Sequence, residues 1–339
     1  FYAYGISADL ISDCSSAGLI RVAGFKDIEK LDYANLKYEE LSEKLLVRYI
    51  AQGTLWKMGE MFQLSVELYD TKDKQVVWSD RWQEKWDNLP MIKGSLSDGL
   101  LKALDTSSKI KKKVEVINAE AYELYLKAKH LYLNREKEND TKIVQGLLNR
   151  ALVLDKNLLI AKSLLAASYR SSDYKKTMNL YSEILEQAQQ SKNIEIIADS
   201  YISLGDLSYE SGKLNVASDY GNRALTKYEN INDKYGVAKC YLLLGSICFT
   251  KGKYDEHLDL LDKVQYIYET LENKKGIFHV KFRRAMSYSG KLEFDKAIEI
   301  YISLLKGFKN ILNKVDHIHI YNNLSYNYGK MCDFKSGFK

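Results

Sequence analysis

Proline is nearly absent from this sequence, since Pro90 is the only one in 339 residues. Proline interrupts helix interiors, and its scarcity is typical of a mostly helical chain with short polar loops. Hydrophobic residues make up 46% of the chain and charged residues 28%. This composition excludes an intrinsically disordered protein and is ordinary for a folded one. At this length the chain has room for two or more cores.

Cysteine is also sparse, and the four cysteines are scattered along the chain without a CxxC pair: Cys14, Cys240, Cys248 and Cys332. Such spacing predicts free thiols in a reducing compartment. We therefore expect a cytoplasmic protein, with a periplasmic one left open as the alternative. No run of about 18 apolar residues occurs, so the sequence predicts no membrane-spanning helix.

Positive charge is in small excess, with 50 Lys and Arg against 45 Asp and Glu and a net charge of +5. A nucleic-acid-binding protein normally concentrates far more basic charge on one face. The only basic run, Lys111 to Lys113, has no interleaved aromatic residues for stacking on bases and is typical of a solvated linker. We expect no nucleic-acid partner for this segment.

Catalytic and cofactor motifs are missing too. The sequence has no GxGxxG and no GxxxxGK[ST] loop, so we expect no nucleotide cofactor. His317 and His319 are two residues apart and point to different sides of a helix, which argues against a metal site. Gly5 to Asp9 resembles a nucleophile elbow without its second glycine. As the start of a helix, Ser7 would be the N-cap and Asp9 would lie in the first turn. We predict no catalytic, cofactor-binding or metal-binding residue.

What the sequence does contain is a repeat. A large residue followed by a small one recurs every 40 residues, at Leu204-Gly205, Leu244-Gly245, Arg284-Ala285 and Leu324-Ser325. Self-similarity at a fixed period of this length indicates stacked helical hairpins. Because no single hairpin buries both of its faces, the units are expected to stack into a solenoid.

Each unit contains the parts of a helical hairpin. The small residue, such as Gly245, allows a neighbouring helix to approach closely. A glycine such as Gly252 ends the first helix, an aromatic residue such as Tyr254 opens the second, and Ala297 marks the small packing position of that second helix.

These features resemble the tetratricopeptide repeat family in its longer form. The matching stretches are YISLGDLSYESGKLNVASDYGNRAL, YLLLGSICFTKGKYDEHLDLL and FRRAMSYSGKLEFDKAIEIYISLL, with weaker units before them. The resemblance implies an α-solenoid of helical hairpins over residues 119–339, with the last repeat truncated. The usual proline at the end of each unit is absent, and polar residues such as Asp233 take its place.

The first hundred residues have a different period. Phe62 to Leu68 alternates apolar and polar residues, which indicates a half-buried strand. The β-rich stretches Tyr49 to Trp56 and Val76 to Trp82 flank it, so we expect a three-stranded antiparallel meander. Leu19 to Ala23 is predicted as a further strand. Helices are predicted over three segments: Ile6 to Cys14, Tyr38 to Leu46 and Pro90 to Leu104.

This part resembles the N-terminal domain of TolB-like proteins, on the stretches YGISADLISDCSS, EELSEKLLVRYIAQGTLWKMGEMFQLSVELYDTKDKQVVWSDRW and WDNLP. The resemblance implies a small α/β domain over residues 1–105, without the strand that begins the domain in other members. A linker is expected at 106–118. The predicted fold class is therefore α+β and mostly α, with a small α/β domain followed by a tetratricopeptide α-solenoid.

The resemblance to tetratricopeptide repeats also implies a binding groove, because the first helices of successive units line a concave face in that family. The groove positions that it gives for a protein or peptide partner are Asp199, Asp206, Lys239, Phe249, His279, Phe282, Met286, Asn322 and Tyr326. The alternative is that several of them only pack neighbouring units together. The Lys/Asn clamp that some members use for a terminal carboxylate is not matched.

Three hypotheses for the function follow. The first is a non-catalytic protein-interaction and regulatory module. The second is the regulatory C-terminal part of a class III adenylate or guanylate cyclase, and the third is that part of a winged-helix transcription regulator; both follow from the resemblance to bacterial proteins with this domain order. The chain starts at Phe1, and we expect it to be an internal piece of a longer protein whose upstream residues would distinguish the three. Neither the partner's identity nor the oligomeric state follows from the sequence.

Overall fold

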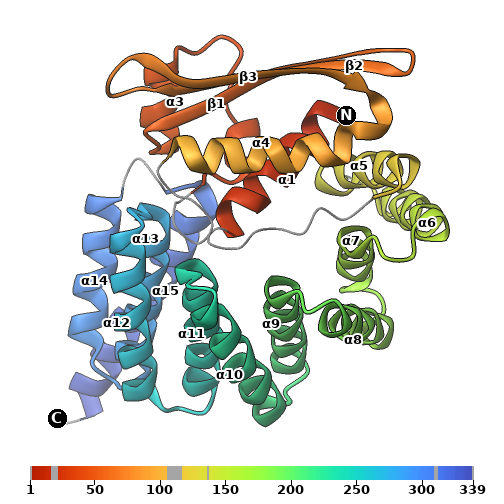
Figure 1. Ribbon diagram of the computed structural model, residues 1–339. Helices are drawn as coiled ribbons and strands as arrows, with labels where there is room; N and C mark the ends of the chain where they lie inside the picture. The colour runs from red at the N-terminus through yellow and green to blue at the C-terminus, as the bar shows by residue number, and fades with distance from the viewer. Residues whose placement is uncertain (1, 17–21, 105–116, 136, 309–311, 338–339) are drawn as a thin grey trace. The chain divides into compact units, whose positions relative to one another are not determined.

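The computed structural model describes residues 2–16, 22–104, 117–135, 137–308 and 312–337 (Figure 1). The chain divides into two compact units. One comprises residues up to Leu204 together with Asn230–Asp233, and the other comprises Gly205–Glu229 and Lys234–Lys339.

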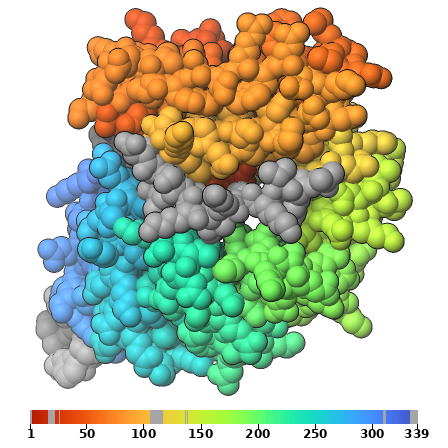
Figure 2. Space-filling model, viewed as in Figure 1, coloured from red at the N-terminus to blue at the C-terminus, as the bar shows by residue number. Residues whose placement is uncertain are grey.

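The first unit contains the predicted antiparallel meander. Strands β1 (Tyr49–Met58), β2 (Met61–Asp70) and β3 (Gln75–Lys85) pair in the order β1-β2-β3. Alternate side chains of β2, from Phe62 to Leu68, are buried as the period of two predicts. Helix α4 (Leu89–Ala103) contacts β3 and packs against the sheet, and side chains fill the space between them on the face that Figure 2 shows. The predicted three-stranded sheet is confirmed.

The other elements of this region are α1 (Tyr2–Ser16), α2 (Phe25–Glu29), α3 (Tyr38–Leu45) and the short 3-10 helix η1 (Trp86–Asn88). The strand predicted from Leu19 lies mostly outside the described residues, and Val22 and Ala23 are in no strand.

The prediction that Ser7 caps the first helix is wrong. Helix α1 already begins at Tyr2, and the Ser7 hydroxyl lies inside it, where it donates to the backbone carbonyl of Ala3 at 2.9 Å. The sequence pattern placed the start too late because Tyr2 and Tyr4 carry no capping signal. Asp9 is consequently in the middle of a helix and is only 3% exposed.

The rest of the chain is a series of helical hairpins, as the repeat predicts. The helices are α5 (Ala119–Leu133), α6 (Glu138–Leu154), α7 (Leu159–Tyr169), α8 (Tyr174–Gln190), α9 (Ile194–Glu210), α10 (Leu214–Asn230), α11 (Lys234–Thr250), α12 (Tyr254–Thr270), α13 (Lys274–Gly290), α14 (Phe294–Gly307) and α15 (Lys314–Gly337). Tyr254 and Phe294 open second helices, as expected. Gly212 and Gly252 take positive φ angles of 75° and 72° at the turns, and Leu292 takes the equivalent φ of 64°.

The core of the first unit runs from the sheet into the first hairpins. Buried residues of β2 and α4 belong to one continuous hydrophobic cluster with buried residues of α5, α6 and α7. Helices α1 and α5 pack closely at Gly5, where an added Cβ would lie 2.8 Å from Leu126 Cδ2. Most of the linker predicted at 106–118 lies outside the described residues.

Candidate binding surfaces

The structure places the predicted groove residues on the first helices of the hairpins, and they differ in exposure. Five are exposed: Asp199, Lys239, His279, Asn322 and Tyr326. Four are half-buried: Asp206, Phe249, Phe282 and Met286. Asp199 belongs to the first unit and the other eight to the second. The surface of the second unit therefore contains eight of the nine positions.

Two of the half-buried aromatic residues pack inside their own hairpins. The Phe249 ring lies 5.5 Å from the Tyr254 ring and 5.4 Å from the His257 ring of α12, measured between centroids. The Phe282 ring lies 5.4 Å from the buried Tyr301 ring of α14 in an edge-to-face arrangement. These contacts hold the two helices of each hairpin together, so the alternative of a packing role applies to both rings.

Neighbouring first helices in the second unit are linked by polar contacts. The Arg283 guanidinium of α13 donates to the Ser246 hydroxyl of α11 at 2.9 Å. Tyr209 in α9 and Thr250 in α11 share a hydrogen bond of 2.9 Å between their hydroxyls. The outward side chains of these helices are thereby held in a fixed order along one surface. Tyr326 on α15, with 56% exposure, is the open aromatic residue among the predicted positions.

A buried polar pair connects α12 to α13. His257 is 2% exposed, and its Nδ1 lies 2.6 Å from the Ser287 hydroxyl. Nε2 has no hydrogen-bond partner within the part of the chain that the structure describes. Burial, together with Arg283 and Arg284, lowers the pKa of His257 to about 4, so the ring is neutral at physiological pH. The equivalent positions 40 residues before and after His257 are Ala217 and Ala297. The replacement of alanine by histidine is the feature of the sequence that indicates this pair.

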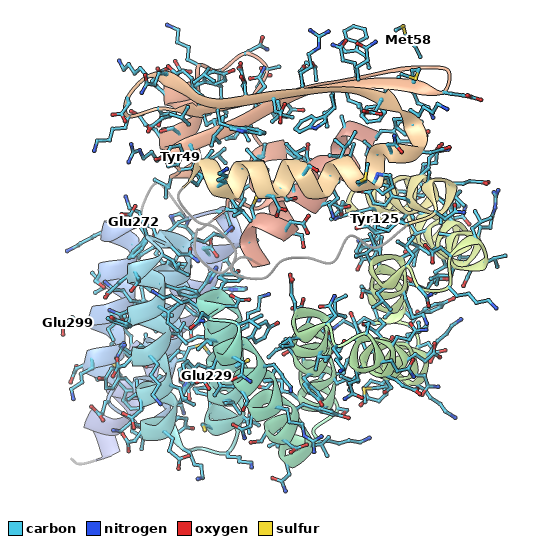
Figure 3. All side chains as sticks on the ribbon, in the orientation of Figure 1. Tyr49, Met58, Tyr125, Glu229, Glu272 and Glu299 are labelled. Carbon is cyan, nitrogen blue, oxygen red and sulfur yellow. The ribbon has the colours of Figure 1, made fainter. Side chains whose placement is uncertain are left out.

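The first unit contains a buried ion cluster around Asp9. One carboxylate oxygen accepts hydrogen bonds from the Tyr125 hydroxyl (2.6 Å) and the Lys129 amine, and the other is 2.9 Å from the Tyr122 hydroxyl and 3.5 Å from Lys93 Nζ. Tyr125 is labelled in Figure 3. Burial alone would raise the pKa of Asp9, but Lys93 and Lys129 outweigh it and hold that pKa below its usual value. Every acceptor position of Asp9 is engaged, which indicates a structural role.

Other candidate chemistry is limited. Across the described residues, no three or more His, Cys, Asp or Glu side chains are grouped so that they could hold a metal ion. None of the four cysteines forms a disulfide. Within the described ranges, no helix combines the length and the apolar character needed to cross a membrane.

Comparison of the sequence with known proteins finds no matching protein-family model and no matching curated protein. Solved structures do resemble the fold. A signal transduction ATPase with numerous domains from Pyrococcus horikoshii, which has a tetratricopeptide repeat sensor, is 14% identical with a TM-score of 0.51; the match covers 74% of this chain and 38% of that protein.

Two further structures are less similar. BtubC from P. vanneervenii is 17% identical with a TM-score of 0.49, over 63% of this chain and 85% of that one. YrrB, described as a tetratricopeptide repeat protein with an unusual peptide-binding site, is 18% identical with a TM-score of 0.38, over 60% and 90%. At these identities the likeness concerns the fold alone. The helical part of the chain has the tetratricopeptide-repeat fold, as the 40-residue spacing predicts.

Proposed function

We propose that this chain is a non-catalytic protein-interaction module whose first helices in the second unit bind a peptide. The observation that carries the proposal is the recurrence of outward side chains at equivalent positions of successive first helices. Lys239 and His279 are 40 residues apart and both are exposed, and the half-buried Met286 and the exposed Tyr326 are likewise 40 residues apart. Solenoids commonly bind partners through such repeated surfaces, and tyrosine and methionine are enriched in protein interfaces.

The N-terminal region favours a regulatory role for this module. We propose that residues 1–105 form a TolB-like domain and that the chain is the regulatory part of a class III cyclase or of a winged-helix regulator. The support is the order of a small sheet with α4 followed by hairpins, and a core that continues from the sheet into α5. Cysteines that form no disulfide fit a cytoplasmic location.

The peptide-binding proposal can be tested with the purified chain. A random peptide library is selected on it, and the affinity of the best peptide is measured by fluorescence anisotropy. Tyr326→Ala on α15 is compared with Tyr266→Ala on α12, because these tyrosines are 56% and 72% exposed but only the first is a predicted groove position. We expect Tyr326→Ala to weaken binding about tenfold, the effect of losing one interface anchor. Equal effects of the two variants would contradict the proposal.

A further inference from the structure

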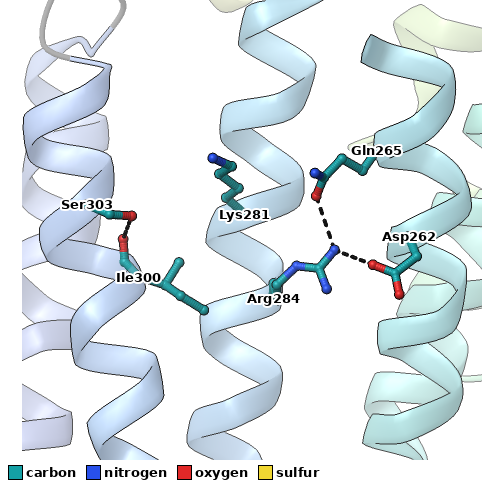
Figure 4. Close-up of a pocket in the computed structure, with 6 residues that line it drawn as sticks. All are labelled: Asp262, Gln265, Lys281, Arg284, Ile300 and Ser303. Carbon is teal, nitrogen blue, oxygen red and sulfur yellow. Dashed lines mark hydrogen bonds and ion pairs between the residues drawn. The ribbon is translucent and has the colours of Figure 1, made fainter. Parts of the chain in front are cut away.

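A cleft in the second unit lies on another surface of the hairpins. It has a volume of about 370 Å³ and lies between α12 and α14, with α13 as its floor (Figure 4). Its lining residues are Asp262 and Gln265 of α12, Lys281 and Arg284 of α13, and Ile300 and Ser303 of α14.

The two cations on the floor break the pattern of the repeat. The positions equivalent to Lys281 are Tyr201, Tyr241 and Tyr321, and those equivalent to Arg284 are Leu204, Leu244 and Leu324. Three units thus have Tyr-x-x-Leu where this one has Lys-x-x-Arg. An aromatic and an aliphatic side chain meet the packing needs of these positions in the other units, so hairpin packing does not require two cations here.

Part of this positive charge is already neutralised. The Arg284 Nη2 donates to Asp262 Oδ1 at 2.6 Å and to Gln265 Oε1 at 3.1 Å. Both bonds use one nitrogen, so the other guanidinium donors are still available. Asp262 is thereby the counter-ion of Arg284.

Lys281 has no such counter-ion. Its amine lies over the Phe308 ring instead, 5.6 Å from the ring centroid. Among the residues that the structure describes, no carboxylate is paired with it. The lining therefore combines two cations with one carboxylate, a surplus of one positive charge.

The cleft is open because a long side chain is missing. In the preceding unit the position equivalent to Ser303 is Lys263, whose amine lies 5.2 Å from the centroid of the Tyr241 ring. In this unit Ser303 takes the position of Lys263, and Lys281 takes the position of Tyr241. The Ser303 hydroxyl is turned back to the Ile300 carbonyl at 2.7 Å, which leaves the space above Lys281 unfilled (Figure 4).

We propose that this cleft binds the carboxylate of an acidic side chain on a peptide partner. A single carboxylate matches the surplus of one positive charge, whereas a phosphate dianion does not. Lys281 supplies the charge, the unused guanidinium donors of Arg284 supply hydrogen bonds, and Ile300 contacts the aliphatic part of the side chain. Residues step about 100° around a helix, so Lys281 and Arg284 lie on the opposite side of α13 from His279. The cleft is thus separate from the surface proposed above and does not depend on it.

The test uses a fluorescein-labelled peptide of about ten residues that alternates Glu and Gly, with Gln in place of Glu as the control. The double variant Lys281→Tyr with Arg284→Leu restores the residues of the other three units, so it is expected to fold, which thermal melting checks. We expect it to weaken binding of the Glu peptide at least about tenfold. Lys263→Ala removes a cation from the preceding unit and should change binding less than about twofold.

Competition experiments on the same peptide distinguish a carboxylate ligand from a phosphate ligand. Sodium propionate, which has a single carboxylate, should displace the Glu peptide from the wild-type chain, and inorganic phosphate should do so only at higher concentration. Equal binding of the Glu and Gln peptides, an equal loss in Lys263→Ala, or stronger displacement by phosphate would each overturn the proposal. Tyr326→Ala should leave the Glu peptide bound. If that variant loses the peptide while the double variant keeps it, the acidic side chain binds at the other surface and the cleft is excluded.

Discussion

The carboxylate of Asp9 in α1 accepts a hydrogen bond of 2.6 Å from the hydroxyl of Tyr125 in α5, 116 residues further along the chain. Both side chains are buried, at 3% and 4% exposure. This bond joins the helix that precedes the sheet to the first helix of the hairpins. The stability of the sheet and that of the first hairpin are therefore expected to be coupled.

Replacing Asp9 by Asn should destabilise the first unit by roughly 3 to 5 kcal/mol, since it leaves Lys129 partly buried without its anion, whereas Lys93 keeps Asp13 at 3.1 Å. Tyr125→Phe removes a single hydrogen bond to a charged group and should cost about 1.5 to 3 kcal/mol. Urea unfolding followed by tryptophan fluorescence measures both, because the chain's Trp residues lie in the sheet region. Asn at position 9 with the stability of the wild type would show that the cluster contributes nothing.

The buried His257 predicts acid sensitivity in the second unit. Its pKa is about 4 in the folded chain, below the usual value of about 6.5, so the unfolded state takes up the proton first. Stability is then lost as the pH falls from about 6.5 to about 4, and the loss between about pH 7.5 and about pH 5 should be about 2 kcal/mol. His257→Ala, which introduces the residue of Ala217 and Ala297, should remove this part of the pH dependence in chemical denaturation. An unchanged pH profile would contradict the assignment.

Leu292 should be a strained position. It has a φ of 64° at a turn where the two preceding units have glycine, and its side chain is 64% exposed. A side chain with a Cβ is disfavoured by about 1 to 2 kcal/mol in this conformation. We expect Leu292→Gly to raise the free energy of unfolding by about 1 kcal/mol and Gly252→Leu to lower it by a similar amount. Thermal melting of the two variants should shift in opposite directions.

Close packing at Gly245 makes a further prediction. An added Cβ there would lie 2.9 Å from Cδ2 of His257, whereas a Cβ at Gly94 meets nothing within 4 Å. Gly245→Leu should therefore destabilise the chain by roughly 1 to 3 kcal/mol, and Gly94→Leu should have little or no destabilising effect. If both variants melted at one temperature, the close approach of α11 and α12 at Gly245 would be wrong.

Local patterns were sufficient to predict the hairpins and the sheet. The 40-residue spacing places the second helices at Tyr254 and Phe294, and the period of two in Phe62 to Leu68 identifies β2, because both signals come from residues close in sequence. The Asp9 cluster was out of reach, since its partners in α5 are more than a hundred residues away. Phe282 shows a second limit: its position in the repeat indicates a groove, whereas its contact with Tyr301 depends on the packing of α14.

The cleft of α12 to α14 was missed for a different reason. The sequence shows that Arg284 replaces the leucine of the equivalent positions, Leu244 and Leu324. This replacement indicates a cleft only once the structure places Lys281 beside Arg284 and the short Ser303 above them. Sequence positions identify unusual residues, and the structure shows which of them share one surface.

Hydrogen exchange can show whether the first helices of the second unit bind a peptide. The peptide selected from the library is added at saturation, and exchange is compared with that of the free chain by mass spectrometry. We expect slower exchange in peptides from α11, α13 and α15, because a bound ligand suppresses local opening. Slower exchange confined to α12 and α14, or to the sheet of the first unit, would contradict it.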